Sequence, residues 1–310
     1  MQTQALLNVL TTPTTTRKIV DTSEFIDYLR TEAITSLTDP FERLVRASMP
    51  AASQANAGIA GHQSAVRRLF QNTPLDAITA FCVSEKRGPH PRYIETQLEI
   101  DGNQARISGE KMWGTMAPAA TLLYVAASTG VIDGQNQLRM VGVSTKAPGI
   151  TQLLLPPDRQ VGGVPICDLR FEATPVDDQH SYPEDAYEFY IKPFRLVEDV
   201  FSTVATQISL QQLGQSAGLS QEQREDLLGL IVQGHAVAES AMDAPGDILL
   251  LTSYLRASQV FWSALESRQS YASTEFKTFW RTNRPILTVA AKAREQRTKN
   301  AWQALGGLNE

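Results

Sequence analysis

Cysteine and histidine, two residue types that often carry out chemistry, are few in this sequence and are placed without an obvious motif. Cys82 and Cys167 each stand among apolar neighbours with no base placed beside them, so both are expected to be reduced, buried thiols. No histidine falls in an H-x-x-x-H or Cys/His spacing, which argues against a metal site; the four are His62, His90, His180 and His235. Neither a G-x-S-x-G nor a Walker A pattern occurs.

Length and composition are those of an ordinary soluble globular protein. The chain has 310 residues, 42% of them hydrophobic and 20% charged, with a formal net charge of -5. That length allows two or three domains with a well-buried core. Both signs of charge are scattered, with no Lys/Arg cluster typical of a nucleic-acid footprint. The N-terminus lacks a secretory signal pattern and no apolar run could span a bilayer, so a cytoplasmic location is expected.

Hydrophobic periodicity divides the chain into three regions. Residues 1–76 predict a short helical domain, residues 77–180 a central β-domain of short strands, and residues 181–310 a helical bundle of four long segments. The strands do not alternate with helices and no GxGxxG occurs, which disfavours a Rossmann fold. We therefore expect an α+β multidomain fold: N-terminal helices, a central barrel-like or sandwich-like β-domain, and a C-terminal four-helix bundle.

Local signals place several boundaries. Thr22 or Ser23 is a plausible N-cap for the first clear helix, and Asp39 with the proline after it predicts the start of another. Ser220-Gln221-Glu222-Gln223 is a capping box, and Ala244-Pro245-Gly246-Asp247 predicts a turn that ends in an N-cap. Residues 97–107 predict a β-hairpin with Asp-Gly or Gly-Asn in its turn.

Two motifs in the β-region then resemble a known family. Two segments are similar to the two flavin-contacting strands of the acyl-CoA dehydrogenases: Phe81-Cys82-Val83-Ser84-Glu85 and, beginning twenty-four residues after Glu85, Gly109-Glu110-Lys111-Met112-Trp113-Gly114-Thr115. Ser144-Thr145-Lys146-Ala147-Pro148-Gly149-Ile150 looks like that family's P-G-I turn, and residues 169–176 resemble a later strand. Near the end, Gln303-Ala304-Leu305-Gly306-Gly307 is similar to the family's Q-x-x-G-G.

The resemblance implies a non-covalently bound FAD. A flavin ring needs hydrogen-bond donors at its edge and an aromatic or apolar surface against its face. By resemblance, Ser84 would lie near the pyrimidine edge, Thr115 near N5, and Trp113 against the ring. The remaining implied cofactor contacts are Phe81, Val83, Gln303, Gly306 and Gly307. The alternative is that Ser84 and Thr115 are ordinary strand residues and Trp113 belongs to the core.

The sequence departs from the family in the loop after Glu85. Small residues are replaced by Lys86-Arg87-Gly88-Pro89-His90-Pro91, a stiffer and more basic segment. One interpretation is a pocket that attracts an anionic substrate through Lys86, Arg87 and His90, and the other is a lost substrate loop. The family's R-x-x-F-G is not found in the bundle.

A catalytic base is harder to place. The helix that carries the glutamate in most family members has no counterpart here, and Glu198 lies where one subgroup has its glutamate, early on the first bundle helix. It would remove the α-proton of an acyl thioester. The alternative is a solvated carboxylate favoured by the helix dipole.

Basic residues near the C-terminal end could meet a pyrophosphate or a CoA phosphate, or form a solvated basic face; they are Arg281, Arg284, Lys292 and Arg294. Pro285 among them predicts a kink or break. Upstream, Tyr254, Leu255 and Trp262 are expected in the bundle core.

Three functions follow from the resemblance. The first is an FAD-dependent oxidoreductase acting on a CH–CH group of an acyl-CoA or related thioester, working with an electron-transfer flavoprotein as a homodimer or homotetramer. The second is a relative without catalysis that acts as a subunit or interaction module. The third is a flavin monooxygenase of the same fold.

Overall fold

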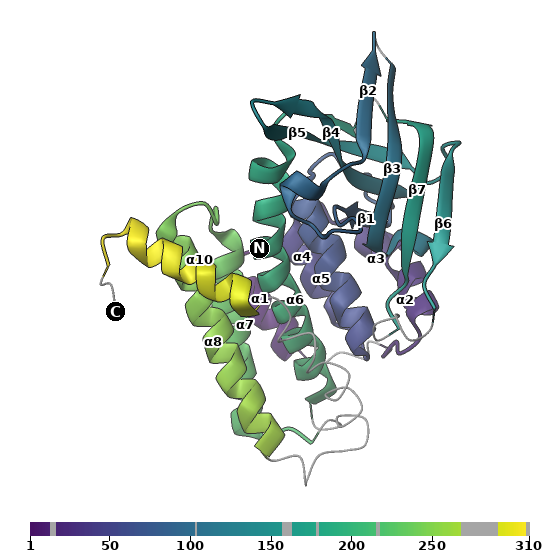
Figure 1. Cartoon of the computed structure of the whole chain (residues 1–310). Coiled ribbons are helices and arrows are strands. Elements are labelled where there is room, and N and C mark those ends of the chain that lie inside the picture. The colour runs from purple at the N-terminus through teal and green to yellow at the C-terminus, as the bar shows by residue number, and fades with distance from the viewer. Residues whose placement is uncertain are drawn as a thin grey trace. The chain divides into compact units, whose positions relative to one another are not determined.

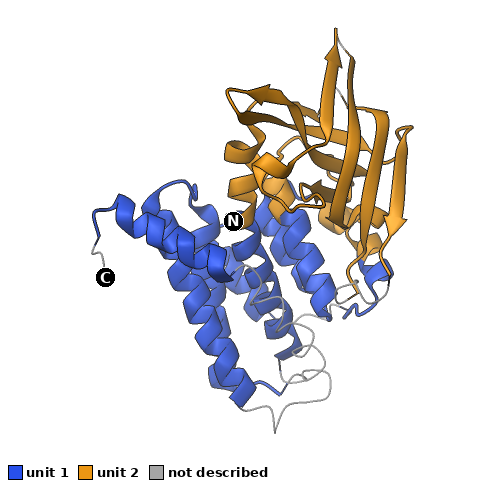
Figure 2. Ribbon diagram, in the orientation of Figure 1, with its two compact units in different colours: residues 1–25, 37–64, 196–310 blue, residues 26–36, 65–195 orange. Residues whose placement is uncertain are grey.

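A computed structural model of the chain describes residues 1–12, 17–102, 104–156, 163–177, 180–214, 218–267 and 291–307. The chain forms two compact units (Figure 2). Unit 1 comprises Met1–Phe25, Leu37–Ser64 and Leu196–Glu310, and unit 2 comprises Ile26–Ser36 and Ala65–Arg195. The division into three domains expected from periodicity stays a prediction.

Unit 2 is built on one eight-stranded sheet (Figure 1). Its strands are β1 (Thr79–Cys82), β2 (Gln97–Asp101), β3 (Gln104–Thr115), β4 (Leu122–Ile132), β5 (Gln135–Ser144), β6 (Ile150–Leu154), β7 (Ile166–Pro175) and β8 (Ser181–Tyr182). The order is β6-β7-β3-β2-β4-β5-β8, with β1 paired in parallel to β4. The expected mixture of helices and sheet is confirmed, whereas the described strands form an open sheet that does not close into a barrel.

Strand pairing in unit 2 follows from local turns and from alternation. The predicted hairpin is β2–β3, which pairs Asp101 with Gln104 across a turn where Gly102 has a φ of 57°. Glycine adopts this left-handed conformation without the clash of a Cβ. One face buries an apolar core that includes Cys82, Val125, Leu169 and Phe171. Unit 2 also contains short helical elements: α3 (Glu32–Thr35), η1 (Pro91–Tyr93), η2 (Ala117–Ala119) and the π-helix η5 (Tyr187–Ile191).

Unit 1 is helical. Its elements are α1 (Thr3–Thr11), most of α2 (Thr22–Tyr28), α4 (Pro40–Ser48), the larger part of α5 (Gln54–Leu69) and of α6 (Lys192–Leu213), α7 (Gln221–Glu239), α8 (Pro245–Ser267) and α10 (Ala291–Ala304). Helix α8 packs against both α7 and α10, and α1 packs against α7. A four-helix bundle stays a prediction. None of the described helices is long and apolar enough to cross a membrane.

Helix boundaries test the capping signals. Asp39 caps α4 by accepting the Glu42 N–H at 2.6 Å, and Ser220 opens α7 with the full capping box. The expected cap of α2 was wrong, because Asp21 performs that role by accepting the Glu24 N–H at 2.8 Å. Helix α8 also begins two residues before Asp247, since Pro245 fits the first helical position.

The helical core contains a buried polar chain. The Tyr254 hydroxyl donates to Gln207 Oε1 at 2.7 Å, and Gln207 Nε2 donates to Ser258 Oγ at 2.9 Å. Tyr254 and Trp262 are buried as expected, and Leu255 is half-buried. Burial raises the pKa of Tyr254, so this hydroxyl stays protonated. The sequence candidates Arg281, Arg284 and Pro285 lie outside the described residues.

Candidate functional site

In unit 2 the fold brings together the two strand segments singled out from the sequence. The Met112 N–H on β3 donates to the Ser84 carbonyl, just after β1, at 2.7 Å. This bond ties the segment containing Ser84 to the part of β3 that carries Trp113 and Thr115. The polar residues expected to act together therefore lie on neighbouring segments of one unit.

A β-bulge turns Trp113 outward. The register between β3 and β7 shifts between Lys111 and Gly114, and Trp113 has a φ of 61°. A bulky residue in this left-handed conformation is strained and requires support from its surroundings. The Asp168 carboxylate on β7 gives that support by accepting the Trp113 N–H at 2.8 Å. The Trp113 side chain is 43% exposed, which excludes the interpretation that it belongs to the core.

Beneath this surface lies a buried ion pair. Lys111 Nζ donates to Glu85 Oε1 at 2.6 Å, with 0% of the lysine side chain and 8% of the glutamate exposed. Glu85 also accepts from the Thr96 hydroxyl at 2.8 Å and from the N–H groups of Glu95 and Thr96 at 2.7 and 3.1 Å. Burial lowers the pKa of Lys111, an effect that the Glu85 carboxylate opposes. The pair therefore joins the segment that contains Ser84 to the part of β3 that carries Trp113.

The hydroxyl groups of Ser84 and Thr115, the two residues singled out from the sequence, have no hydrogen-bond partner among the described residues. Both residues are half-buried. Phe81 instead packs its ring against Phe194 at 4.2 Å, and Val83 is buried. Ser84, Trp113 and Thr115 therefore offer an aromatic surface and two donors, and a contact of Phe81 or Val83 with a cofactor stays a prediction.

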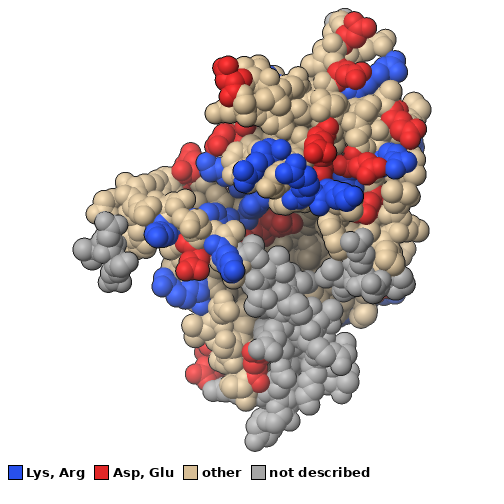
Figure 3. Space-filling model, viewed as in Figure 1, with Lys and Arg blue, Asp and Glu red and all other residues tan. Residues whose placement is uncertain are grey.

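The basic loop after Glu85 is held in a defined shape. Gly88 N–H donates to the Glu85 carbonyl at 2.8 Å, and the Arg87 guanidinium lies 4.3 Å from the centre of the Tyr93 ring. His90 Nδ1 accepts the Arg92 N–H at 3.3 Å and so caps the short helix η1. Cationic side chains gather on the face that carries this loop (Figure 3). Lys86 is exposed beside them.

In unit 1, Glu198 on α6 has a partner that sequence reasoning missed. His62 Nδ1 on α5 lies 2.9 Å from Glu198 Oε1. The imidazole is 6% exposed, whereas the carboxylate is 41% exposed. A buried ring that contacts one oxygen fixes the carboxylate and leaves its other oxygen accessible. No sequence signal links the two residues, since they are 136 positions apart.

The glycines at the end of α10 terminate that helix. Gly306 has a φ of 70°, and its N–H donates to the Gln303 carbonyl at 3.1 Å. The Gly307 N–H donates to the Trp302 carbonyl at 2.9 Å. This bonding pattern is a Schellman motif, which requires a residue that tolerates positive φ. Helix termination is sufficient to account for Gly306, and a contact of Gln303 with a cofactor stays a prediction.

Both cysteines are free and buried in the core of unit 2, as expected. Burial raises the pKa of the Cys82 thiol to about 12, and burial raises that of Cys167 to about 11. Such thiols are protonated and unreactive near neutral pH. Among the described residues, no group of three His, Cys, Asp or Glu side chains could hold a metal ion.

Comparison with known proteins identifies the fold. No protein-family model matches the sequence, and no curated protein sequence matches it. Solved structures do match. Butyryl-CoA dehydrogenase from Megasphaera elsdenii aligns with a TM-score of 0.64 over 97% of this chain and 98% of its own, at 14% identity. The chain has the acyl-CoA dehydrogenase fold.

Two other matching structures are not acyl-CoA dehydrogenases by name. The prolyl acyl carrier protein oxidase AnaB aligns with a TM-score of 0.62 at 13% identity, over 92% of this chain and 88% of its own. KijD3, in complex with FMN and a dTDP-amino-sugar, aligns with a TM-score of 0.65 at 15% identity, over 93% and 87%. At these identities the likeness is one of fold. Structures of this fold accordingly include a butyryl-CoA dehydrogenase, a prolyl acyl carrier protein oxidase and a protein in complex with a dTDP-sugar.

Proposed function

We propose that this protein is a flavin-dependent oxidoreductase of the acyl-CoA dehydrogenase type. One observation carries the proposal: Trp113 is held outward on a bulge, and the hydroxyl groups of Ser84 and Thr115, on the two joined segments, make no hydrogen bond among the described residues. A non-glycine residue held in a left-handed backbone conformation costs stability, and such residues cluster at functional sites. The fold of the chain and the identity of both strand motifs agree with this proposal.

The residues present fit a flavin ring. Trp113 would lie against the ring, and the Ser84 and Thr115 hydroxyls would donate to its polar edge. The Glu85–Lys111 pair holds the two segments that bear these groups. A bound flavin would supply a two-electron acceptor for a hydride. We propose FAD as the flavin, with Gln303 of α10 meeting its dinucleotide part.

Glu198 is the base that we propose. Its role would be to take the α-proton of an acyl thioester while the β-hydrogen leaves as hydride. The contact with His62 orients the carboxylate, which is the condition for efficient proton transfer. The proposed substrate is an acyl-CoA or a related thioester, oxidised at a CH–CH bond. An electron-transfer flavoprotein and a second copy of the chain are the proposed partners.

Anaerobic half-reactions test the function. The FAD-loaded protein is mixed with butyryl-, octanoyl- and palmitoyl-CoA, and the visible flavin absorbance is followed. The proposal expects bleaching by at least one thioester, followed by slow reoxidation in oxygen. Rapid reoxidation after chemical reduction, without bleaching by any thioester, would indicate a flavin monooxygenase instead. A chain that binds no flavin would be a subunit or interaction module.

A paired substitution tests the base. Glu198→Gln is expected to lower the bleaching rate by about a hundredfold or more, because it removes the proton acceptor. Glu188→Gln is the matched control, since Glu188 is an exposed carboxylate that bonds only to Lys192 among the described side chains. Equal rates for the two variants would remove Glu198 from the mechanism and leave the flavin site untouched.

A further inference from the structure

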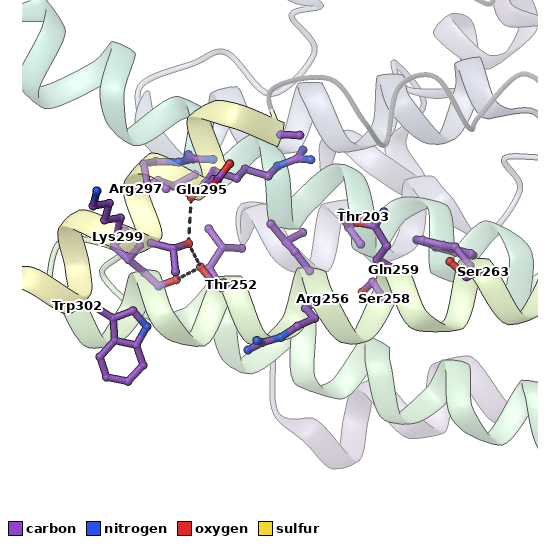
Figure 4. Close-up of a pocket in the computed structure, with 18 of the residues that line it drawn as sticks. Thr203, Thr252, Arg256, Ser258, Gln259, Ser263, Glu295, Arg297, Lys299 and Trp302 are labelled. Atoms are coloured by element: carbon purple, nitrogen blue, oxygen red, sulfur yellow. Dashed lines mark hydrogen bonds between the residues drawn. The ribbon is translucent and has the colours of Figure 1, made fainter. Parts of the chain in front are cut away.

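Unit 1 contains a cavity of about 680 Å³ bounded by α6, α8 and α10 (Figure 4). Its volume is in the range of small-molecule sites. The apolar part of the lining comes from all three helices and comprises Leu196, Ile248, Leu251, Leu255, Trp262 and Trp302. Trp302 is 52% exposed, so part of this aromatic surface remains open to solvent.

The polar groups of this cavity are unevenly distributed. Arg297 and Lys299 lie with Trp302 towards one end, whereas the hydroxyl groups of Thr203, Ser258 and Ser263 lie towards the other (Figure 4). Arg256 and Arg294 also line the cavity, as do the acidic residues Glu266 and Glu295. Among the described lining residues, cations therefore outnumber carboxylates. A hydrogen bond of 2.9 Å between the hydroxyl groups of Thr252 on α8 and Thr298 on α10 joins these two helices.

An arginine pair concentrates positive charge at this site. Asp199 receives both guanidinium groups: Arg294 Nη2 donates to Oδ1 at 2.6 Å, and Arg297 Nη2 donates to Oδ2 at 2.7 Å. The Asp199 carboxylate thus serves both guanidinium groups. Within the described residues, Nη1 of Arg297 is buried and has no hydrogen-bond partner. A buried donor left unbonded is costly.

We propose that this cavity binds an amphipathic anion, an alkyl or acyl chain that ends in a phosphate or carboxylate. The anionic end would accept from Arg297, with Lys299 adding charge, because a guanidinium presents paired donors that match such oxygens. The chain would pack on Leu251, Leu255 and Trp262. None of the three residues proposed to hold the flavin ring, Ser84, Trp113 and Thr115, lines the cavity.

Calorimetric titration of the full chain with decyl phosphate, below its micelle concentration, tests this binding. One molecule per chain is expected to bind. Inorganic phosphate, which lacks the chain, and decanol, which lacks the charge, are each expected to bind about tenfold more weakly or worse. Decanoate distinguishes the two anionic groups: tighter binding of decanoate would identify the ligand as a carboxylate, and weaker binding as a phosphate. Decanol binding as tightly as decyl phosphate would overturn the proposal.

Substitutions localise the binding. Arg297→Gln is expected to weaken decyl phosphate by about tenfold to a hundredfold, the loss typical of a hydrogen bond to a charged group. Lys292→Gln removes the same charge from α10 at an exposed position outside the lining, and should change affinity less than about twofold. An equal loss of affinity for decyl phosphate in both variants would contradict binding in this cavity. Should Arg297→Gln not fold, Leu255→Trp, which fills the cavity, must abolish binding; retained affinity would refute the proposal.

Discussion

The buried ion pair of Glu85 and Lys111 allows a sharp prediction, because its two partners are unequally supported. The carboxylate of Glu85 has three donors besides the lysine, from Glu95 and Thr96. The ammonium of Lys111 has one further acceptor, the Val83 carbonyl at a distant 3.4 Å. Removing the lysine therefore leaves a bonded carboxylate, whereas neutralising the glutamate leaves a buried charge almost uncompensated.

The magnitudes follow from this asymmetry. Glu85→Gln is expected to lower the free energy of unfolding by about 3–5 kcal/mol, the cost of breaking a buried pair from one side. Lys111→Met should cost less, about 1–3 kcal/mol, since the remaining donors satisfy Glu85. The double substitution should be about 2 kcal/mol more stable than Glu85→Gln alone, because the stranded ammonium is gone.

Urea denaturation of the four proteins, arranged as a double-mutant cycle, measures these differences. The control is Glu110→Gln, which breaks an exposed ion pair between Glu110 on β3 and Arg170 on β7. The two side chains are 56% and 50% exposed, respectively. That change should leave the unfolding free energy close to that of the unchanged protein. The reasoning is refuted if Lys111→Met destabilises more than Glu85→Gln, or if the cycle shows no coupling.

Three further predictions concern the same unit. Trp113→Ala should weaken FAD binding about tenfold with little loss of stability, as measured by fluorescence titration. The control is Trp302→Ala, which removes another exposed tryptophan, in unit 1, and should not change the affinity for FAD. Gly109→Ala should lower the free energy of unfolding by about 1–3 kcal/mol more than Gly130→Ala does, as measured by thermal or urea unfolding. Both glycines have positive φ, but only at Gly109 would an added Cβ meet the Thr96 backbone, at 2.6 Å. The folded pKa of Cys82, about 12, exceeds the unfolded value, so its stability contribution is complete below the unfolded pKa and declines as pH rises. Urea unfolding between about pH 9 and 11 measures how the free energy of unfolding falls with pH. In Cys82→Ala that fall should be shallower by about 1.4 kcal/mol per pH unit, and equal slopes in the two proteins would contradict the burial of this thiol.

Features encoded within a few residues could be predicted from the sequence. The capping box at Ser220, the cap at Asp39 and the hairpin turn at Gly102 each depend on neighbours in the chain. The cap of α2 was missed although Asp21 stands directly before Thr22, because Asp21, Thr22 and Ser23 are adjacent and all three residue types are good N-caps.

Features that depend on distant residues could not be predicted. The support of Trp113 comes from Asp168, and the contact of Glu198 comes from His62, both across long sequence separations. The bulge that exposes Trp113 likewise arises from pairing between β3 and β7. Residue types therefore indicated the chemistry, and tertiary structure supplied the partners that orient it.

The central claim is that Ser84, Trp113 and Thr115 hold a flavin. The most direct measurement is a titration of the purified protein with FAD, following visible absorbance and thermal stability together. We expect a yellow protein or a saturable rise in melting temperature, since a ligand that binds only the folded state stabilises it. That rise should be diminished in Trp113→Ala. A colourless protein whose melting temperature is unchanged at saturating FAD would contradict the proposed function.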